Sequence, residues 1–239
     1  MPALTARSVV LSVLLGAHPP QLPARELVRI AEKLDIGDAT LRVALTRMVA
    51  AGDLHRNGSL YRLNDRLVER QRRQDEAIHP RTVAWDGRWE IVAVTGTGRT
   101  AAERAALRTR LAALRLAERR EGLWLRPANL ARAWPDDIGH LVERFTGEPG
   151  RDPRELAGVL WDVDGWDDTA TTLLHQFHDA GTPAQRFAVA AAIVRLLLTD
   201  PVLPPPLLTR HPPPADAVRA AYRQYRDTFL DDIGRAGGR

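Results

Sequence analysis

Hydrophobic side chains recur at intervals of three and four along the first 51 residues, and this spacing predicts three amphipathic helices. The first extends from about residue 5 to residue 16. The second begins near Pro23, because proline is favoured in the first turn of a helix. The third covers residues 38 to 51 and stops at Gly52.

A hairpin is predicted directly after the third helix. Asn57 and Gly58 separate two short strand-like runs, 54–56 and 59–63, and an Asn-Gly pair supplies the positive φ angles of a tight type I′ turn. Helix, helix, helix, hairpin is the order of a winged helix-turn-helix domain. We assign this domain, with a charged connecting helix at its end, to residues 1–80.

Strand patterns begin beyond the connecting helix. Residues 85–96 predict a strand, residues 100–117 a helix rich in alanine and arginine, and residues 123–126 another strand. Residues 140–146 fit either a short helix or a fourth strand, and periodicity leaves both open. The order strand, helix, strand indicates a small α/β unit, which we assign to residues 81–150.

Helical patterns return after Asp152. Four segments each carry an apolar stripe, namely 153–163, 167–180, 183–199 and 215–230. Seven of the 17 prolines lie between residues 201 and 214, which predicts a stiff, extended connection. We assign a helical C-terminal domain to residues 151–239, so the fold class is a multi-domain α+β protein.

The composition narrows the class of protein. With 44% hydrophobic and 27% charged residues among 239, the chain can bury a substantial core. The absence of cysteine excludes disulfides, thiolate metal sites and a cysteine nucleophile. Residues 1–126 carry 22 basic and 14 acidic side chains, net +8, whereas residues 127–239 carry 12 and 16, net −4. Only the first part therefore suits a polyanionic partner.

Two apolar stretches decide whether secretion or membrane insertion is expected. Residues 9–15 are compatible with a signal peptide, but the same stretch fits an ordinary amphipathic helix, which the next helices need as core. The stretch 187–203 is interrupted by Arg195, Asp200 and Pro201 and is too short to span a bilayer. We therefore expect a soluble, cytoplasmic protein with no membrane contact.

The third helix carries the clearest candidate site. If Leu41, Leu45 and Met48 face the core, the opposite side of the helix is free to enter the major groove of DNA. That side carries Thr40, Arg42, Val43, Thr46 and Arg47. Arginine bonds a guanine edge with two hydrogen bonds, and threonine bonds bases or phosphates. The hairpin adds His55, Arg56, Asn57 and Arg62 for phosphates or a minor groove. The alternative is a winged helix that binds another protein.

Two polar clusters are compatible with metal binding. The run WDVDGWDD at 161–168 is similar to the start of a calcium loop, and His175 and His178 lie one helical turn apart. A loop opening at Asp162 would need glutamate at its twelfth position, where the chain has Leu173, and no HExxH motif is present. We expect these residues to be structural, and we expect no metal or cofactor.

Six tryptophans are many for a chain with four phenylalanines, and they either anchor the domains or line a pocket for an aromatic ligand. They are Trp85, Trp89, Trp124, Trp134, Trp161 and Trp166. The sequence has no Walker A motif, no dinucleotide fingerprint and no GxSxG motif. Phosphate-loop and serine-hydrolase functions therefore have no support.

Five segments in order resemble the PaaX family, the repressors of phenylacetate catabolism. They are LRVALTRMVAAGDL with the YRLN strand after it, WDGRW, GLWLRP, ELAGVLWDVD and DPVLPPPLL. The resemblance implies a dimeric, ligand-responsive transcriptional regulator. It also implies a winged-helix domain, a central ferredoxin-like domain similar to the CRISPR protein Cas2, and a helical C-terminal domain. For residues 140–146 it favours the strand.

One departure from the family concerns the effector, which in the family is usually the aryl-CoA thioester phenylacetyl-CoA. Before the DPxLP segment, family members often carry histidine, an acidic residue, tyrosine and arginine, whereas this chain has Ala191, Ala192, Ile193 and Val194. The loss of polar groups indicates a different effector, or none. An acyl-CoA needs cations for its phosphates and an apolar slot, for which the candidates are Arg88, Trp89, Trp124, Arg126 and Arg195.

Taken with the resemblance, these features predict a homodimeric DNA-binding repressor of an aromatic or acyl-CoA catabolic operon, bound to an inverted-repeat operator, and not an enzyme. The effector is an acyl-CoA or an aromatic small molecule. The alternative is a Cas2-like metal-dependent nuclease, which needs a carboxylate near the end of the first central strand. The chain offers only Glu90 at the beginning of that strand and Asp86 before it.

Overall fold

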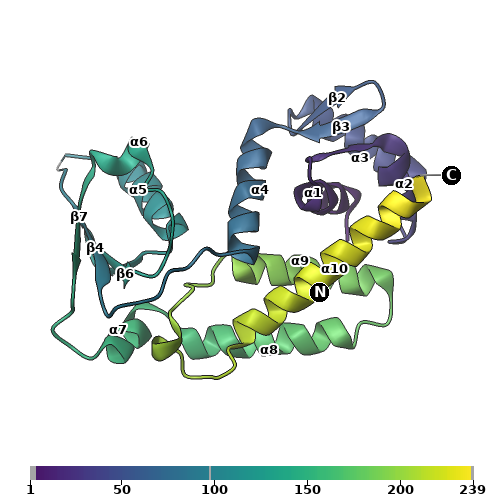
Figure 1. Cartoon of the computed structure of the whole chain (residues 1–239). Coiled ribbons are helices and arrows are strands. Elements are labelled where there is room, and N and C mark those ends of the chain that lie inside the picture. Colours follow the sequence, from purple (N-terminus) through teal and green to yellow (C-terminus); the bar gives the residue numbers. More distant parts are fainter. Residues whose placement is uncertain (1–3, 97, 238–239) are drawn as a thin grey trace. The chain divides into compact units, whose positions relative to one another are not determined.

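The computed structural model describes residues 4–96 and 98–237, with the side chains of the last helix described up to Phe229 (Figure 1). The chain folds into two compact units, and each is described by itself. Unit 1 consists of Met1–Ile78, Ala170–Leu198 and Ala215–Arg239, and unit 2 of His79–Thr169 and Thr199–Pro214.

The first half of unit 1 has the element order that the spacing predicts. Three helices come first and the hairpin follows: α1 (Ala6–Gly16), α2 (Ala24–Glu32), α3 (Asp38–Ala50), β2 (Leu54–Asn57) and β3 (Leu60–Leu63). The three helices and the hairpin are therefore confirmed. A further strand, β1 (Gln21–Pro23), pairs with β3, so the sheet has the order β1-β3-β2. Three residues are too few to show an alternating pattern in the sequence.

The turn of the hairpin differs from the prediction. Asn57 is the last residue of β2 and pairs with Leu60, which leaves Gly58 and Ser59 as the turn residues. Only Gly58 has a positive φ, 58°. A type I′ turn needs positive φ at both central residues, so that prediction is wrong. Glycine at the first central position is the pattern of a type II′ turn.

The ends of α1 and α3 show why these helices begin and end where they do. The side chain of Thr5 accepts a hydrogen bond from the backbone N–H of Ser8 at 3.1 Å, and the Ser8 hydroxyl oxygen accepts one from Thr5 N–H at 3.0 Å. This capping box satisfies backbone donors that the first turn leaves unpaired. Gly52, directly after α3, has φ 71°, a left-handed conformation that ends a helix.

The core of unit 1 is formed by the apolar faces of α1, α2 and α3. Its largest fully buried side chains include Leu14, Leu27, Ile30, Leu41, Leu45 and Met48. Phe187, from α9 (Pro183–Leu197), is buried in the same cluster. A helix from the second half of the chain therefore completes the core of the first three helices.

The helix α4 (Asp65–Ile78) is attached to the end of α1 by one side chain. Gln71 Nε2 donates hydrogen bonds to the carbonyl oxygens of Leu14, Leu15 and Ala17 at 3.3, 3.0 and 2.8 Å. Carbonyl groups in the last turn of a helix have no partner within the helix. The buried Gln71 amide supplies the missing donor.

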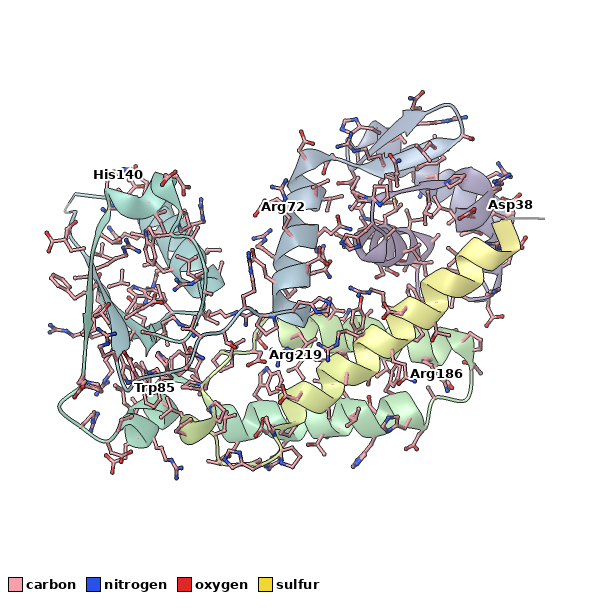
Figure 2. All side chains as sticks on the ribbon, viewed as in Figure 1. Asp38, Arg72, Trp85, His140, Arg186 and Arg219 are labelled. Carbon is pink, nitrogen blue, oxygen red and sulfur yellow. The ribbon has the colours of Figure 1, made fainter. Side chains whose placement is uncertain are left out.

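The helices after residue 151 are present, but most of them belong to the same compact unit as the first part of the chain. Unit 1 contains α9, the part of α8 (Val163–His178) from Ala170 onwards, and α10 (Pro214–Gly237) from Ala215 onwards. Arg219 of α10, labelled in Figure 2, is buried and donates through Nε to the carbonyl oxygen of Ala77 at 3.2 Å. The three domain ranges remain predictions, and the observed grouping differs from them.

Unit 2 contains a four-stranded antiparallel sheet in the order β5-β6-β4-β7. The elements are β4 (Trp89–Val94), α5 (Ala101–Ala113), β5 (Ala117–Arg120), β6 (Leu123–Pro127), α6 (Asp136–Gly139) and β7 (Val142–Gly147). The strand and helix predictions for this region are confirmed. β7 pairs with β4 along its whole length, so the region around residues 140–146 is mainly a strand.

The two faces of this sheet are both covered. On one face Val92 and Trp124 pack with Leu107 and Leu111 of α5. On the other face Trp89 is fully buried among α7 (Pro153–Leu160), the proline-rich segment and Trp161. The rings of Trp89 and Trp161 are stacked with centroids 6.4 Å apart.

The predicted proline-rich connection packs onto unit 2. It contains a short 3-10 helix, η1 (Pro205–Leu207), and it buries Leu203 and Leu207. The amide nitrogen of Asn129 donates to the carbonyl oxygen of Val202 at 2.9 Å. The segment is therefore anchored by a buried hydrogen bond as well as by apolar contacts.

We predict that Gln71→Leu destabilises unit 1. The substitution removes the donor for three carbonyl oxygens at the end of α1 and should lower the free energy of unfolding by about 2 kcal/mol. Urea denaturation followed by circular dichroism measures this change. Arg72→Leu, at the exposed neighbouring position, is the control and should leave the midpoint unchanged. Equal midpoints for Gln71→Leu and the wild type would contradict the assigned role.

Candidate nucleic-acid interface

The exposed face of α3 has the composition predicted from the sequence. Leu41, Leu45 and Met48 are buried, as expected. The residues opposite them are all exposed, namely Thr40, Arg42, Val43, Thr46 and Arg47. Val43, the one apolar side chain of the five, is 51% exposed. The structure therefore brings all five candidate side chains together on one surface.

The polar groups on this face are not equivalent. Arg42 Nε lies 2.7 Å from Asp38 Oδ1, and the hydrogen bond to Asp38, with its charge, raises the pKa of Arg42. Asp38, labelled in Figure 2, stands at the first position of α3. The Thr46 hydroxyl donates to the carbonyl oxygen of Arg42 at 3.0 Å. Among the described residues, the side chain of Arg47 has no hydrogen bond or ion pair, so its guanidinium is available to a ligand.

The start of α1 contributes a cation that the sequence analysis did not assign to this site. Arg7 shares a concave surface with Thr40, Val43 and Arg47 of α3. Its Nη1 atom lies 2.7 Å from Asp53 Oδ2, and Arg66 Nη2 lies 2.8 Å from the other oxygen of this carboxylate. Asp53 is only 5% exposed, so both arginines are held by a buried anion. A basic residue at the start of a helix gives no sequence signal of this arrangement.

The candidate residues of the hairpin lie on two faces of the sheet. His55 is paired across the strands with Arg62, and Asn57 with Leu60, on the face away from the core. Arg56 is paired instead with Tyr61, and its guanidinium lies 5.8 Å from the centre of that ring. Arg56 Nε also donates to the carbonyl oxygen of Gly58 at 2.9 Å. Arg62 and Asn57 therefore share a face that Arg56 does not.

The five effector candidates are not brought together. Trp89 is fully buried on one face of the sheet in unit 2, and Trp124 is 5% exposed on the other. Arg88 is exposed and donates to Asp86 at 2.7 Å. Arg126 is fully buried, and Arg195 belongs to unit 1. The four candidates in unit 2 therefore do not form one ligand site.

Arg126 is a structural group of unit 2. Its Nη2 atom donates to Asn129 Oδ1 at 2.7 Å, and its Nε atom donates to the carbonyl oxygen of Pro127 at 3.0 Å. Burial lowers the pKa of Arg126 to about 9, so the guanidinium stays charged at neutral pH. Since Asn129 also bonds the proline-rich segment, Arg126 holds that attachment in place.

Unit 1 contains a cavity of about 180 Å³ lined by α1, α4, α9 and α10. Arg195 lies at this cavity, and it is the one effector candidate that does. Ala191 and Val194, two of the residues that depart from the family pattern, also line it. Sequence reasoning could not find the cavity, because its walls come from distant segments.

The carboxylates considered for metal chemistry have other partners. Glu90 Oε2 accepts a hydrogen bond from Arg132 at 2.7 Å, and Asp86 is bonded to Arg88. In the run at 161–168, Asp162 accepts a hydrogen bond from the backbone N–H of Gly165 at 3.0 Å. Within the described ranges, no three His, Asp or Glu side chains gather as metal ligands would.

The helices of unit 1 and the four-stranded sheet of unit 2 define an α+β protein with a helical unit and a ferredoxin-like unit. Two family models match the chain: "PaaX-like protein" over residues 5–67, and "PaaX protein central Cas2-like domain" over residues 82–146. Together they cover more than half of its length. The chain belongs to the PaaX family of transcriptional regulators, as the resemblance in the sequence implies.

A solved structure is similar over almost the whole chain. It is the uncharacterized protein Rv0674 from Mycobacterium tuberculosis, which is 48% identical, with 97% of this chain and 98% of that chain covered and a TM-score of 0.82. No curated protein matches the chain. Of the helices in the described part, none is both long and apolar enough to cross a membrane.

We predict that Arg126→Ala destabilises unit 2 strongly. Asn129 Oδ1 and the Pro127 carbonyl oxygen lose their donor, so the free energy of unfolding should fall by roughly 3 kcal/mol. Chemical denaturation monitored by circular dichroism provides the value. Arg88→Ala removes an exposed arginine from the same unit and should leave the transition where it is. A stable Arg126→Ala variant would show that this arginine is not structural.

Proposed function

We propose that the chain is a DNA-binding repressor whose N-terminal elements form a winged helix. In this arrangement α3 enters the major groove and the hairpin of β2 and β3 contacts the backbone. The observation that carries the proposal is the exposed face of α3, where all five predicted contact residues lie opposite a fully buried apolar face. Arg7 adds a cation at the same surface.

The two arginines of α3 take different roles in this proposal. Asp38 holds Arg42 at 2.7 Å and limits its rotamers, so Arg42 is preorganised to meet a base edge with two hydrogen bonds. Arg47 has no ion-pair partner among the described residues and suits a phosphate or a base. On the hairpin, Arg62 and Asn57 share the outward face and suit the phosphate backbone.

The proposed mode of regulation rests on family membership and on the small number of base pairs that one recognition helix can contact. A single helix reads only a few base pairs, so a repressor needs two half-sites for useful discrimination. We infer a homodimer on an inverted repeat, with an aromatic or acyl-CoA catabolic operon under its control. An effector that binds the free protein better than the operator complex releases the operator.

We predict that Arg42→Ala and Arg62→Ala differ in their effects on DNA binding. Arg42→Ala should reduce the preference for the operator over unrelated DNA roughly tenfold or more. Arg62→Ala should weaken binding to all sequences alike and reduce the salt dependence by about one phosphate contact. Fluorescence anisotropy titrations at several salt concentrations measure both quantities.

The control for these variants is Arg120→Ala, which removes an exposed arginine from unit 2. Its affinity for both kinds of DNA should equal that of the wild type. The proposal is overturned if a gel-shift survey of the gene's own upstream region finds no preferred site at moderate salt. It is also overturned if Arg42→Ala leaves the preference intact.

We predict that the protein is a dimer in solution and on its operator. Multi-angle light scattering at micromolar concentration should give twice the mass of one 26.5 kDa chain. On DNA, the stoichiometry should be two chains for each inverted repeat, and an isolated half-site should bind with weaker affinity. A monomer both free and on the full operator would contradict the dimer.

A further inference from the structure

The cavity in unit 1 has the size of a site for one small ligand. Its volume of about 180 Å³ compares with about 150 Å³ for an engineered protein cavity that binds benzene. Ser12 of α1, Gln74 of α4, Val194 of α9 and Tyr222 of α10 represent its four walls. All four helices belong to unit 1, so the cavity is complete within that unit.

The cavity interior is aromatic. Phe187, Tyr222, Tyr225 and Phe229 line it, and three of these rings are already in contact. The centroids of Phe187 and Phe229 are 5.9 Å apart, and those of Tyr225 and Phe229 are 5.7 Å apart. Tilted rings at such distances favour a further aromatic ring, which can add edge-to-face contacts.

Small side chains on α9 leave room for that ring. Ala190 and Ala191 line the cavity where larger residues would fill it. Val194, one turn further along the helix, adds an apolar wall. The replacement of polar family residues by Ala191 and Val194 therefore makes this side of the cavity apolar.

Cations surround the cavity. Arg70 of α4, Arg195 of α9 and Arg226 of α10 all line it. Arg226 lies 3.3 Å from Asp227. Among the described residues, the side chains of Arg70 and Arg195 make no ion pair or hydrogen bond. Three guanidinium groups at one apolar cavity favour an anion, and the fork of N–H donors on a guanidinium matches a planar carboxylate.

The remaining polar groups of the cavity differ in what they offer an anion. Asp75, the one acidic residue that lines the cavity, is bonded to His18 at 2.9 Å. The Gln74 side-chain oxygen is buried and has no hydrogen-bond partner in the described structure. Burial raises the pKa of Tyr222 and of Tyr225, so both hydroxyls stay neutral and can donate a hydrogen bond. The two tyrosine hydroxyls can therefore donate to a carboxylate, whereas Gln74 Oε1 is an acceptor and can pair only with a donor group.

We propose that this cavity binds a small aromatic carboxylate, with its ring among the four aromatic side chains and its carboxylate at Arg70 and Arg195. The proposal rests on the proposed function, since the ligand would be the effector of the regulator. The volume admits one ring and a short acid chain. A CoA thioester would have to leave its nucleotide outside this volume, and a thioester has no free carboxylate to offer.

The position of the cavity connects the ligand to the DNA-contacting helix. α1 forms one wall of the cavity and packs directly on α3. α4, a second wall, is bonded to the end of α1 through Gln71. A carboxylate bridging Arg70 of α4 and Arg195 of α9 would hold α4 against α9 and change the freedom of α1. Operator affinity then depends on the ligand if the two conformations of unit 1 differ in affinity for it.

Isothermal titration calorimetry on the full chain tests the site directly. The probes are benzoate and 3-phenylpropanoate, with benzylamine as the cationic counterpart and an aryl-CoA thioester as the family alternative. We expect at least one acid to bind with one site per chain and the amine not to bind. Arg70→Gln or Arg195→Gln should each weaken acid binding about tenfold. Arg73→Gln, an exposed arginine of α4 outside the cavity, should leave it unchanged.

A second variant separates the site from general destabilisation. Ala191→Phe fills the cavity and should abolish acid binding while operator affinity without ligand and the circular dichroism spectrum stay as in the wild type. The proposal is overturned if neither acid binds, if only the thioester binds, or if Arg73→Gln weakens binding as much as Arg195→Gln. If acid binds but operator affinity does not change, the regulatory link fails. DNA binding without acid tests the proposed function separately.

Discussion

The burial of Phe187 among α1, α2 and α3 is the contact on which the organisation of unit 1 depends. Three short helices and a small sheet bury a limited apolar area, and a side chain from α9 completes their core. This contact, the packing of α9 on α4 and the bond from Arg219 of α10 to Ala77 join the last helices of the chain to the same compact unit as the helix that we propose to read DNA. The cavity exists for the same reason, since two of its walls belong to α9 and α10.

Local structure was predicted well from the sequence, and the grouping of elements was not. Helical spacing predicts α1, α2 and α3 and the buried face of α3, and the strand-like runs around Asn57 and Gly58 predict both strands of the hairpin. Spacing shows that a face is buried but not which partner buries it, so α9 and α10 were assigned to a separate domain. The short strand β1 was missed because three residues carry no period. The turn was displaced by one residue because Asn57 continues the ladder of β2.

The candidate DNA-contacting residues on α3 could be predicted from the sequence, whereas the candidate effector residues on the other elements could not. Exposure on α3 follows from helical geometry, so all five residues there could be placed. The residues on β4 and β6 were chosen as neighbours in sequence, but alternate side chains of a strand point to opposite faces. Trp89 therefore faces away from Trp124, and Arg126 is buried where it bonds Asn129. Arg195 was selected for its charge, and its partners at the cavity come from other helices.

The two units contain different fluorescent side chains. All six tryptophans lie in the segments of unit 2, whereas Tyr61, Tyr222 and Tyr225 lie in those of unit 1. Selective excitation of indole therefore follows the packing of unit 2, while far-ultraviolet dichroism, which registers every helix, weights the helix-rich unit 1. Comparing the two signals during denaturation tells whether the two units melt as one cooperative body or in sequence, without any label or engineered probe.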